Sequence, residues 1–255
     1  MNKELGRTIK LFLLWWSLYL ATLIICTILG HVFKNIEITK WALVTGYLLI
    51  AVLFFGKGYV KLSFGRIDRR MVWPAVGMSV LIAIACFFAV CSVFSLLGFD
   101  LFYQGKELER RQQLFSGIAG ALHACIFGPI VEEIGFRGLV LDGLLKTRCR
   151  PWVAILISAV AFGLLHGFWA NFVTATLFGI LAGWLYWRTG SIIPGLIIHV
   201  TNNSLTAIDL SNQTNTFYLI TLVVGLVLLA YGLWWFWKKF SYAKPYYYNY
   251  KTMKK

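Results

Sequence analysis

The chain has 255 residues, of which 59% are hydrophobic and 13% are charged, and its formal net charge is +14. A soluble domain carries about 45–50% apolar and about 25% charged residues, so this composition excludes an ordinary soluble protein and indicates an integral membrane protein. The basic excess would suit a nucleic-acid-binding protein, but the distribution of the charges along the chain excludes that class.

Eight apolar stretches are long enough, or nearly so, to cross a hydrocarbon core of about 30 Å. We expect helices near residues 10–30, 41–56, 71–99, 113–131 (running on to about 147), 151–169, 171–187, 191–208 and 217–237. The first stretch is too long for the core of a signal peptide and has no evident cleavage site after it, so we expect it to be retained. The predicted fold class is an all-α, polytopic membrane helical bundle of about eight transmembrane helices.

The basic residues predict the orientation of the chain. When successive loops are assigned alternately to two sides, 18 of the 24 Lys and Arg residues fall on the side that holds both termini. Cytoplasmic segments carry such an excess, so both termini are expected in the cytoplasm. The basic and aromatic tail AKPYYYNYKTMKK would contact anionic lipid headgroups, and nucleic acid is not an expected partner. Short loops favour a multi-pass protein of a bacterial plasma membrane, and no pattern predicts an oligomeric state.

Polar content divides the chain into three predicted parts. Residues 1–112 would form scaffold helices and an outside loop, whose polar segment from Asp100 to Gln112 would be a short lid or an interfacial helix. Residues 113–208 would form the functional core, and residues 209–255 the last transmembrane helix and the tail. The first three helices carry no charge at bilayer depth, so function is expected between about residues 113 and 205.

Two adjacent acids, Glu132 and Glu133, fall inside an apolar segment, GPIVEEIGFRG, whereas the other acids were assigned to loops or tails. An ionisable side chain at bilayer depth costs about 2.5–3.5 kcal/mol on insertion scales and is retained mainly where it has a function. His166 and His199 are expected at comparable depth. Glu133 precedes Arg137 by four residues, the favourable order for a helix ion pair, so this pair is expected to be structural.

The spacing of these residues along their helices tests whether they can meet. Glu132 lies 17 residues before Cys149, which sits in a polar turn, and His166 lies 17 residues after it. In an antiparallel hairpin both positions would be roughly 25 Å along their helices at 1.5 Å per residue. His199 and Asn203 would lie roughly 14 and 20 Å beyond the next inside turn, WRTGS. The four side chains are therefore expected at similar depth on three helices.

Three further features lie close to these residues. Gly128 and Pro129 are expected to loosen the helix one turn before the glutamates and to admit water there. Phe162 lies four residues before His166 and should pack beneath it on the same helix face. His123 has no obvious partner, so we expect its side chain to form an ordinary hydrogen bond between helices.

A carboxylate beside a histidine can hold and deprotonate a water molecule. A second histidine and a side-chain amide can donate hydrogen bonds to an oxyanion that develops on an attacked carbonyl group. No Ser or Cys is clearly placed as a nucleophile with a base, so attack of water on an amide is the simplest reaction. A zinc site with Glu132, His166 and His199 as ligands is the alternative, although the sequence has no HExxH motif.

Three motifs in this region resemble those of one family. The segment Glu132-Glu133-x-x-x-Arg137 resembles its EExxxR motif, Phe162-x-x-x-His166 its FxxxH motif, and His199-x-x-x-Asn203 its HxxxN motif. This is the pattern of the CPBP family, which contains CAAX prenyl proteases of the Rce1 type and bacterial bacteriocin-processing or immunity (Abi) proteins. The resemblance covers roughly residues 113–205, with the motifs in order.

The resemblance implies an intramembrane endopeptidase with a cavity open to the cytoplasm. By position, Glu132 and His166 would activate the water, His199 and Asn203 would form the oxyanion hole, and Glu133 and Arg137 would support the site. It favours a glutamate protease without a cofactor over a zinc enzyme, and a peptide or a membrane-anchored protein as substrate.

Two other classes of function are alternatives. A non-catalytic immunity or scaffold protein would bind its partner in the membrane, but this chain keeps all the motif residues. A proton-coupled transporter would also use Glu and His, but it would be expected to contain inverted repeats and paired broken helices, and the sequence has one break, at Gly128-Pro129.

Overall fold

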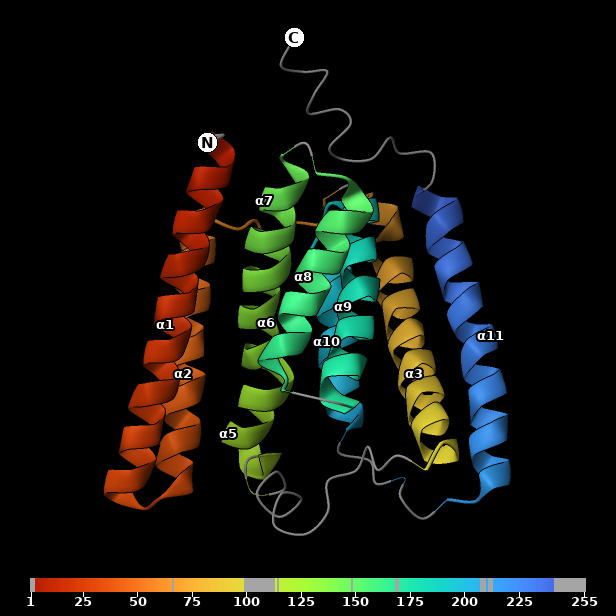
Figure 1. Ribbon diagram of the computed structural model, residues 1–255, viewed down its shortest axis with the longest axis horizontal. Helices are drawn as coiled ribbons and strands as arrows, with labels where there is room; N and C mark the ends of the chain where they lie inside the picture. Colours follow the sequence, from red (N-terminus) through yellow and green to blue (C-terminus); the bar gives the residue numbers. More distant parts are fainter. Residues whose placement is uncertain are drawn as a thin grey trace. The chain divides into compact units, whose positions relative to one another are not determined.

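The computed structural model describes residues 3–65, 67–98, 113, 115–147, 149–167, 170–206, 210 and 213–240. Within these residues the chain forms helices and turns and contains no strand (Figure 1). The eight predicted apolar stretches each correspond to a helical stretch, and the predicted all-α, polytopic membrane bundle is confirmed. The predicted lid from Asp100 to Gln112 and the tail after Phe240 lie outside the described residues.

The chain divides into two compact units. The first contains Met1–Lys61 and Tyr103–Thr147, and the second contains Leu62–Phe102 and Arg148–Lys255. The division falls inside the predicted functional core, 113–208, so residues of that segment belong to both units.

In the first unit, α1 (Lys3–Phe33) and α2 (Ile36–Gly56) lie side by side as a hairpin (Figure 1). The turn between them places Lys34 at φ +47°, and the side chain of Asn35 caps α2 by accepting a hydrogen bond from the Glu37 N–H at 2.9 Å. The two helices cross closely at Gly46, where a Cβ atom would lie 2.4 Å from Cγ2 of Thr22. Small residues permit such close approach of membrane helices.

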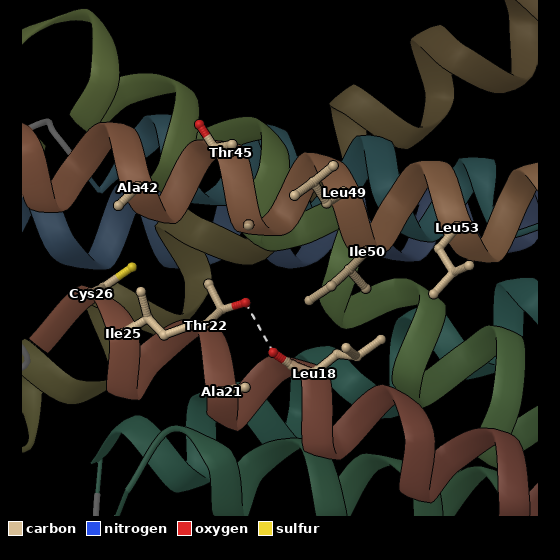
Figure 2. Close-up of a pocket in the computed structure, with 11 residues that line it drawn as sticks. Leu18, Ala21, Thr22, Ile25, Cys26, Ala42, Thr45, Leu49, Ile50 and Leu53 are labelled. Carbon is tan, nitrogen blue, oxygen red and sulfur yellow. Dashed lines mark hydrogen bonds between the residues drawn. The ribbon is translucent and has the colours of Figure 1, made fainter. Parts of the chain in front are cut away.

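An apolar groove of about 480 Å³ runs between α1 and α2 (Figure 2). Its polar side chains are hydrogen-bonded within their own helices: the Thr22 hydroxyl donates to the Leu18 carbonyl at 2.9 Å, and the Thr45 hydroxyl donates to the Trp41 carbonyl at 2.8 Å. The groove therefore offers mainly apolar contacts, of the kind that a lipid chain makes, and none of its lining residues is charged.

The remaining helical stretch of the first unit runs continuously from residue 117 to 145 but changes its pitch along the way. Its successive segments are α5 (Gly117–Ala121), the π-helical η2 (Leu122–Phe127), α6 (Gly128–Glu133), the π-helical η3 (Ile134–Leu141) and α7 (Asp142–Leu145). Asp142 is therefore helical, where the sequence placed it in a loop, and it forms an ion pair with Lys146, one turn further on.

The buried Lys40 ties α2 to the beginning of this stretch. Its ammonium group donates to the Glu37 carboxylate at 2.6 Å and to both the carbonyl and the hydroxyl oxygen of Ser116 at 2.9 Å. The side chain is fully buried, and its three donors have three oxygen partners, which offsets the cost of removing a charge from water.

The second unit contains the short η1 (Arg69–Met71) followed by α3 (Val72–Leu96), then α8 (Pro151–Leu165), α9 (Ala170–Thr189), α10 (Ile193–Leu205) and α11 (Asn215–Phe240). Helix α3 packs against α10 and α11, and α8 packs against α9. The α8–α9 contact is close, since a Cβ atom at Gly163 would lie 2.1 Å from Oγ1 of Thr176 and one at Gly179 would lie 2.9 Å from Cα of Ala159.

Four of the described helices are long and apolar enough to cross a membrane: α1, α2, α3 with η1, and α11. Helix α8 has 15 residues, which is roughly 22 Å at 1.5 Å per residue and shorter than a hydrocarbon core of about 30 Å. The sequence extended this helix to residue 169, whereas the helix ends at Leu165 and Gly167 has φ +91°. His166 is therefore the residue that ends a short helix, rather than a residue within a long one.

Candidate functional site

Glu133 and Arg137 form an ion pair inside the first unit, as their spacing predicts. Nη1 of Arg137 lies 2.9 Å from Oε1 of Glu133, and the two side chains are 1% and 0% exposed. The guanidinium also interacts electrostatically with Glu132. Because removal of either partner of a buried pair leaves an uncompensated charge, this pair fixes the local conformation of the helix that carries Glu132.

The helix loosens next to the glutamates, and it does so as π-helix. The Gly128 N–H donates to the carbonyl of His123, five residues earlier, where an α-helix would use the fourth. A Cβ atom at Gly128 would lie 2.9 Å from that carbonyl oxygen, so glycine suits this position. A second π-helical segment, η3, begins directly after Glu133. Single π-helical turns are rare and frequently occur at functional sites.

Trp15 of α1 holds the other side of this helix. Its ring is fully buried, and its Nε1–H donates to the carbonyl of Val131 at 3.0 Å, one residue before Glu132. The ring lies over Gly135, where a Cβ atom would be 2.4 Å from Cζ2, and contacts Phe136 edge to face at 5.6 Å between centroids. The backbone on both sides of Glu132 is thus packed against α1.

Two tyrosines outside the predicted core lie near Glu132. Tyr19 of α1 and Tyr47 of α2 are 6% and 3% exposed, and their rings stack at 5.6 Å between centroids. Both phenol groups lie close enough to Glu132, which is half-buried, to interact with it electrostatically. The His123 ring stacks on Tyr47 at 5.4 Å, which supplies the contact that the sequence did not reveal. Sequence reasoning missed both tyrosines because they are distant in the chain.

In the second unit, His166 lies directly after α8. Its Nδ1 is 3.0 Å from the carbonyl oxygen of Phe162, and the two rings are 4.5 Å apart between centroids, so Phe162 packs beneath His166 as the spacing predicts. The contact of Nδ1 with a carbonyl oxygen favours the tautomer that carries its proton on Nδ1, which leaves Nε2 as the basic nitrogen.

His199 of α10 approaches the same phenylalanine. Its ring is edge-on to Phe162 at 5.5 Å between centroids and tilted to Phe178 of α9 at 5.4 Å, and it is 2% exposed. Asn203 follows one turn later on α10 and is half-buried. The second unit therefore brings the FxxxH and HxxxN motifs together around the ring of Phe162.

The four candidate residues are divided between the units: Glu132 lies in the first, and His166, His199 and Asn203 lie in the second. The approach of Glu132 to the histidines stays a prediction from the spacing along the helices. A catalytic zinc site uses three protein ligands, so the two imidazoles of the second unit would need Glu132 as a third.

The fold defines a polytopic helical membrane protein, and each of its units places candidate polar residues together: Glu132, Glu133 and Arg137 in the first, and His166, His199 and Asn203 in the second. Residues 114–205 match the family described as type II CAAX prenyl endopeptidase Rce1-like. The predicted family resemblance is confirmed over this segment.

The chain is also similar to a Bacillus subtilis (strain 168) protein named "Putative membrane peptidase YdiL". The two are 31% identical over 141 residues, which are 52% of this chain and 57% of the relative, so the match spans little more than half of the relative's length. No solved structure matches the chain.

Proposed function

We propose that this protein is an intramembrane endopeptidase that hydrolyses a peptide bond with a water molecule activated by Glu132 and His166. The Rce1-like match and the membrane peptidase name of the relative support this activity in general. The observation that carries the mechanism is the shared contact of His166 and His199 with Phe162, because it brings a candidate base and a candidate oxyanion donor to one ring.

In the proposed mechanism, the Glu132 carboxylate accepts a proton from the water while Nε2 of His166 accepts a hydrogen bond from it. The water oxygen attacks the carbonyl carbon of the scissile bond, and the developing oxyanion accepts hydrogen bonds from His199 and from the side-chain amide of Asn203. Collapse of the tetrahedral intermediate breaks the C–N bond, and Glu132 returns its proton to the leaving amine. Atoms and protons balance without a cofactor.

The substrate class follows from where the polar residues lie. Glu132 belongs to a helical stretch in an apolar chain, so the scissile bond has to reach bilayer depth. A peptide or a membrane-anchored protein can place its scissile bond at that depth. We propose that the protein acts on such a substrate in a bacterial plasma membrane. Basic residues on the cytoplasmic side of the protein would bind the anionic lipid headgroups that surround the protein.

The test is cleavage of a fluorogenic peptide library by purified protein, with Glu132→Gln as the matched variant and with or without a zinc chelator. Glu132→Gln keeps the size of the side chain and removes the base. Activity that needs Glu132 and survives chelation would support the glutamate mechanism. Activity that is lost on chelation and restored by zinc would instead make Glu132 and the two histidines ligands.

A non-catalytic role predicts a different result. If neither the wild type nor Glu132→Gln cleaves any peptide and both support the same cellular immunity, the protein acts by binding a partner. The melting temperatures of the two proteins have to agree for that comparison to hold.

A further inference from the structure

Arg188 lies in the last turn of α9, and three indole rings surround its guanidinium group. The guanidinium carbon, Cζ, is 4.5 Å from the ring centroid of Trp237, 5.8 Å from that of Trp187 and 5.9 Å from that of Trp184. Nη2 donates a hydrogen bond to the carbonyl oxygen of Trp237 at 3.3 Å, which joins the C-terminal ends of α9 and α11. A carbonyl group in the last turn of a helix has no partner within the helix, so this bond also caps α11.

The surroundings of Arg188 leave its charge without a counter-ion and part of its hydrogen-bonding capacity unused. The residue is 9% exposed, and no carboxylate among the described residues forms an ion pair with it. The faces of the indole rings attract the cation but do not replace an oxygen acceptor. Nε of Arg188 is buried and has no acceptor among the described residues. A buried cation with one long hydrogen bond is costly unless an anion completes its environment.

A second unused donor lies beside the guanidinium group. The Nε1–H of Trp187 is buried and has no acceptor within the part of the chain that the structure describes. Because the Trp187 ring centroid is 5.8 Å from Cζ of Arg188, an anion with several oxygens can accept hydrogen bonds from both groups. Indole and guanidinium groups are donors only, so together they suit an anion and not a cation.

The location of these donors indicates a lipid as the source of the anion. Trp152 of α8 packs against Trp187 at 5.7 Å between ring centroids, and Trp152 and Trp237 are 56% and 53% exposed. Exposed indole rings at the ends of membrane helices favour the headgroup layer of a bilayer. The basic residues of the sequence predict that this end of α9 is cytoplasmic, and the cytoplasmic leaflet carries the anionic lipids.

We propose that Arg188 and Trp187 form a binding site for the phosphate group of an anionic phospholipid. The phosphate oxygens accept hydrogen bonds from Nε of Arg188 and Nε1 of Trp187, and the phosphate charge neutralises the guanidinium. Trp152 contacts Trp187 and Trp237 contacts Arg188, so displacement of these two exposed rings admits the headgroup to the donors. A zwitterionic headgroup suits the site less, because its own ammonium group would lie near the guanidinium. The site goes beyond the proposed function, since none of its residues takes part in the proposed chemistry.

The test is thermal unfolding of the purified protein in zwitterionic detergent micelles, titrated with phosphatidylglycerol, phosphatidylcholine or inorganic phosphate. Phosphatidylglycerol should raise the melting temperature of the wild type and saturate, because a ligand of the folded state stabilises it by mass action. Phosphatidylcholine and inorganic phosphate should have little effect at the same concentrations. The titration gives an apparent affinity for each lipid and needs no peptide cleavage.

Three variants separate a defined site from general attraction to a charged bilayer. Arg188→Gln should weaken the apparent affinity for phosphatidylglycerol about 10- to 100-fold, because it removes a charged donor. Trp187→Phe keeps an aromatic ring and loses the N–H, and should weaken the affinity about 3- to 10-fold. Lys239→Gln is the matched control, since Lys239 is an exposed residue in the last turn of α11 and its loss removes the same charge. It should change the affinity by no more than about twofold, because exposed charges are screened.

Other results would overturn the site. An equal loss of affinity in all three variants would mean diffuse attraction between basic residues and lipid, and equal stabilisation by phosphatidylcholine would mean that the headgroup charge is not recognised. Saturable stabilisation by inorganic phosphate alone would assign the donors to a soluble anion. If Arg188→Gln fails to fold because it loses the bond to the Trp237 carbonyl, Trp187→Phe decides, since it keeps that bond. Wild-type affinity in Trp187→Phe would then refute the site.

Discussion

Gly135 offers a test of how tightly the helix of Glu132 is held. Substitution by alanine would normally stabilise a helix interior by about 1 kcal/mol. At Gly135, however, the new Cβ atom would lie 2.4 Å from Cζ2 of Trp15, a separation that real Cβ atoms essentially never show. Trp15 has little freedom to move, because its ring is fully buried and its Nε1–H is bonded to the Val131 carbonyl.

Overpacking of this kind costs about 1–3 kcal/mol, and the clash involves a rigid ring, so the upper half of that range applies. After subtraction of the gain in helix propensity, Gly135→Ala should lower the free energy of unfolding by about 1–2 kcal/mol. Gly77→Ala is the matched control: Gly77 lies inside α3, and a Cβ atom there would meet nothing within 4 Å. That variant should be about 0.5–1 kcal/mol more stable than the wild type.

The assay is reversible unfolding in mixed detergent micelles, followed by intrinsic fluorescence, with peptide cleavage measured on the same preparations. Gly135→Ala should also lower kcat, because a displaced Trp15 shifts the backbone next to Glu132. A stability of Gly135→Ala equal to or above that of Gly77→Ala would refute the reasoning. Restoration of stability in the double variant with Trp15→Leu would show that the ring causes the loss.

The other predictions concern the ion pair, the buried lysine and the shared phenylalanine. Arg137→Met should destabilise the fold by about 3–5 kcal/mol because it leaves Glu133 buried and without its cation, and the double change with Glu133→Gln should recover much of that loss in the same unfolding assay. Lys40→Met should cost about 1–3 kcal/mol, since three oxygen partners lose their donor, and should leave the KM for peptide cleavage by the remaining folded protein unchanged. Phe162→Leu should lower kcat at least tenfold with KM unchanged, because leucine lacks the ring that His166 packs on; unchanged kcat would contradict the importance of this contact.

Hydropathy and local spacing predicted much of the fold. The eight apolar stretches all became helical, because a backbone in hydrocarbon has to satisfy its hydrogen bonds within the segment. The Glu133–Arg137 pair and the contact of Phe162 with His166 follow from i, i+4 spacing, which requires nothing beyond one turn of helix.

The departures from the sequence-based prediction have physical causes. The π-helical segments η2 and η3 are apolar apart from His123 and Arg137, so no change in hydrophobic period marks their wider turns. Helix α8 ends before His166 because Gly167 adopts a positive φ, and the sequence contains many other glycines that do not. The position of a single glycine in an apolar stretch therefore does not reliably predict where a helix ends.

The residues around Glu132 could not be predicted for a different reason. Trp15, Tyr19 and Tyr47 look like ordinary interior or interfacial aromatic residues of membrane helices, and their partners lie about 80 to 120 positions away in the sequence. The motifs identify the residues that carry the proposed chemistry, but they contain no information about which helix packs beside them. This applies especially to neutral partners, since charge is the signal that makes an intramembrane residue conspicuous.

Within the first unit, the Rce1-like segment depends on contacts with helices that lie outside it. The part of it in the first unit packs on α1 and α2 through Trp15 and Lys40, and Cβ atoms at Gly138 and Gly143 would lie 2.6 Å from Val60 and 2.2 Å from Thr8. A helix with a buried ion pair and two π-helical segments is poorly suited to stand alone in lipid, because its polar groups then lose the donors and the close packing that neighbouring helices supply. The motif helix and the N-terminal hairpin are therefore one structural element, and substitutions in the hairpin should affect turnover even though no motif residue lies there.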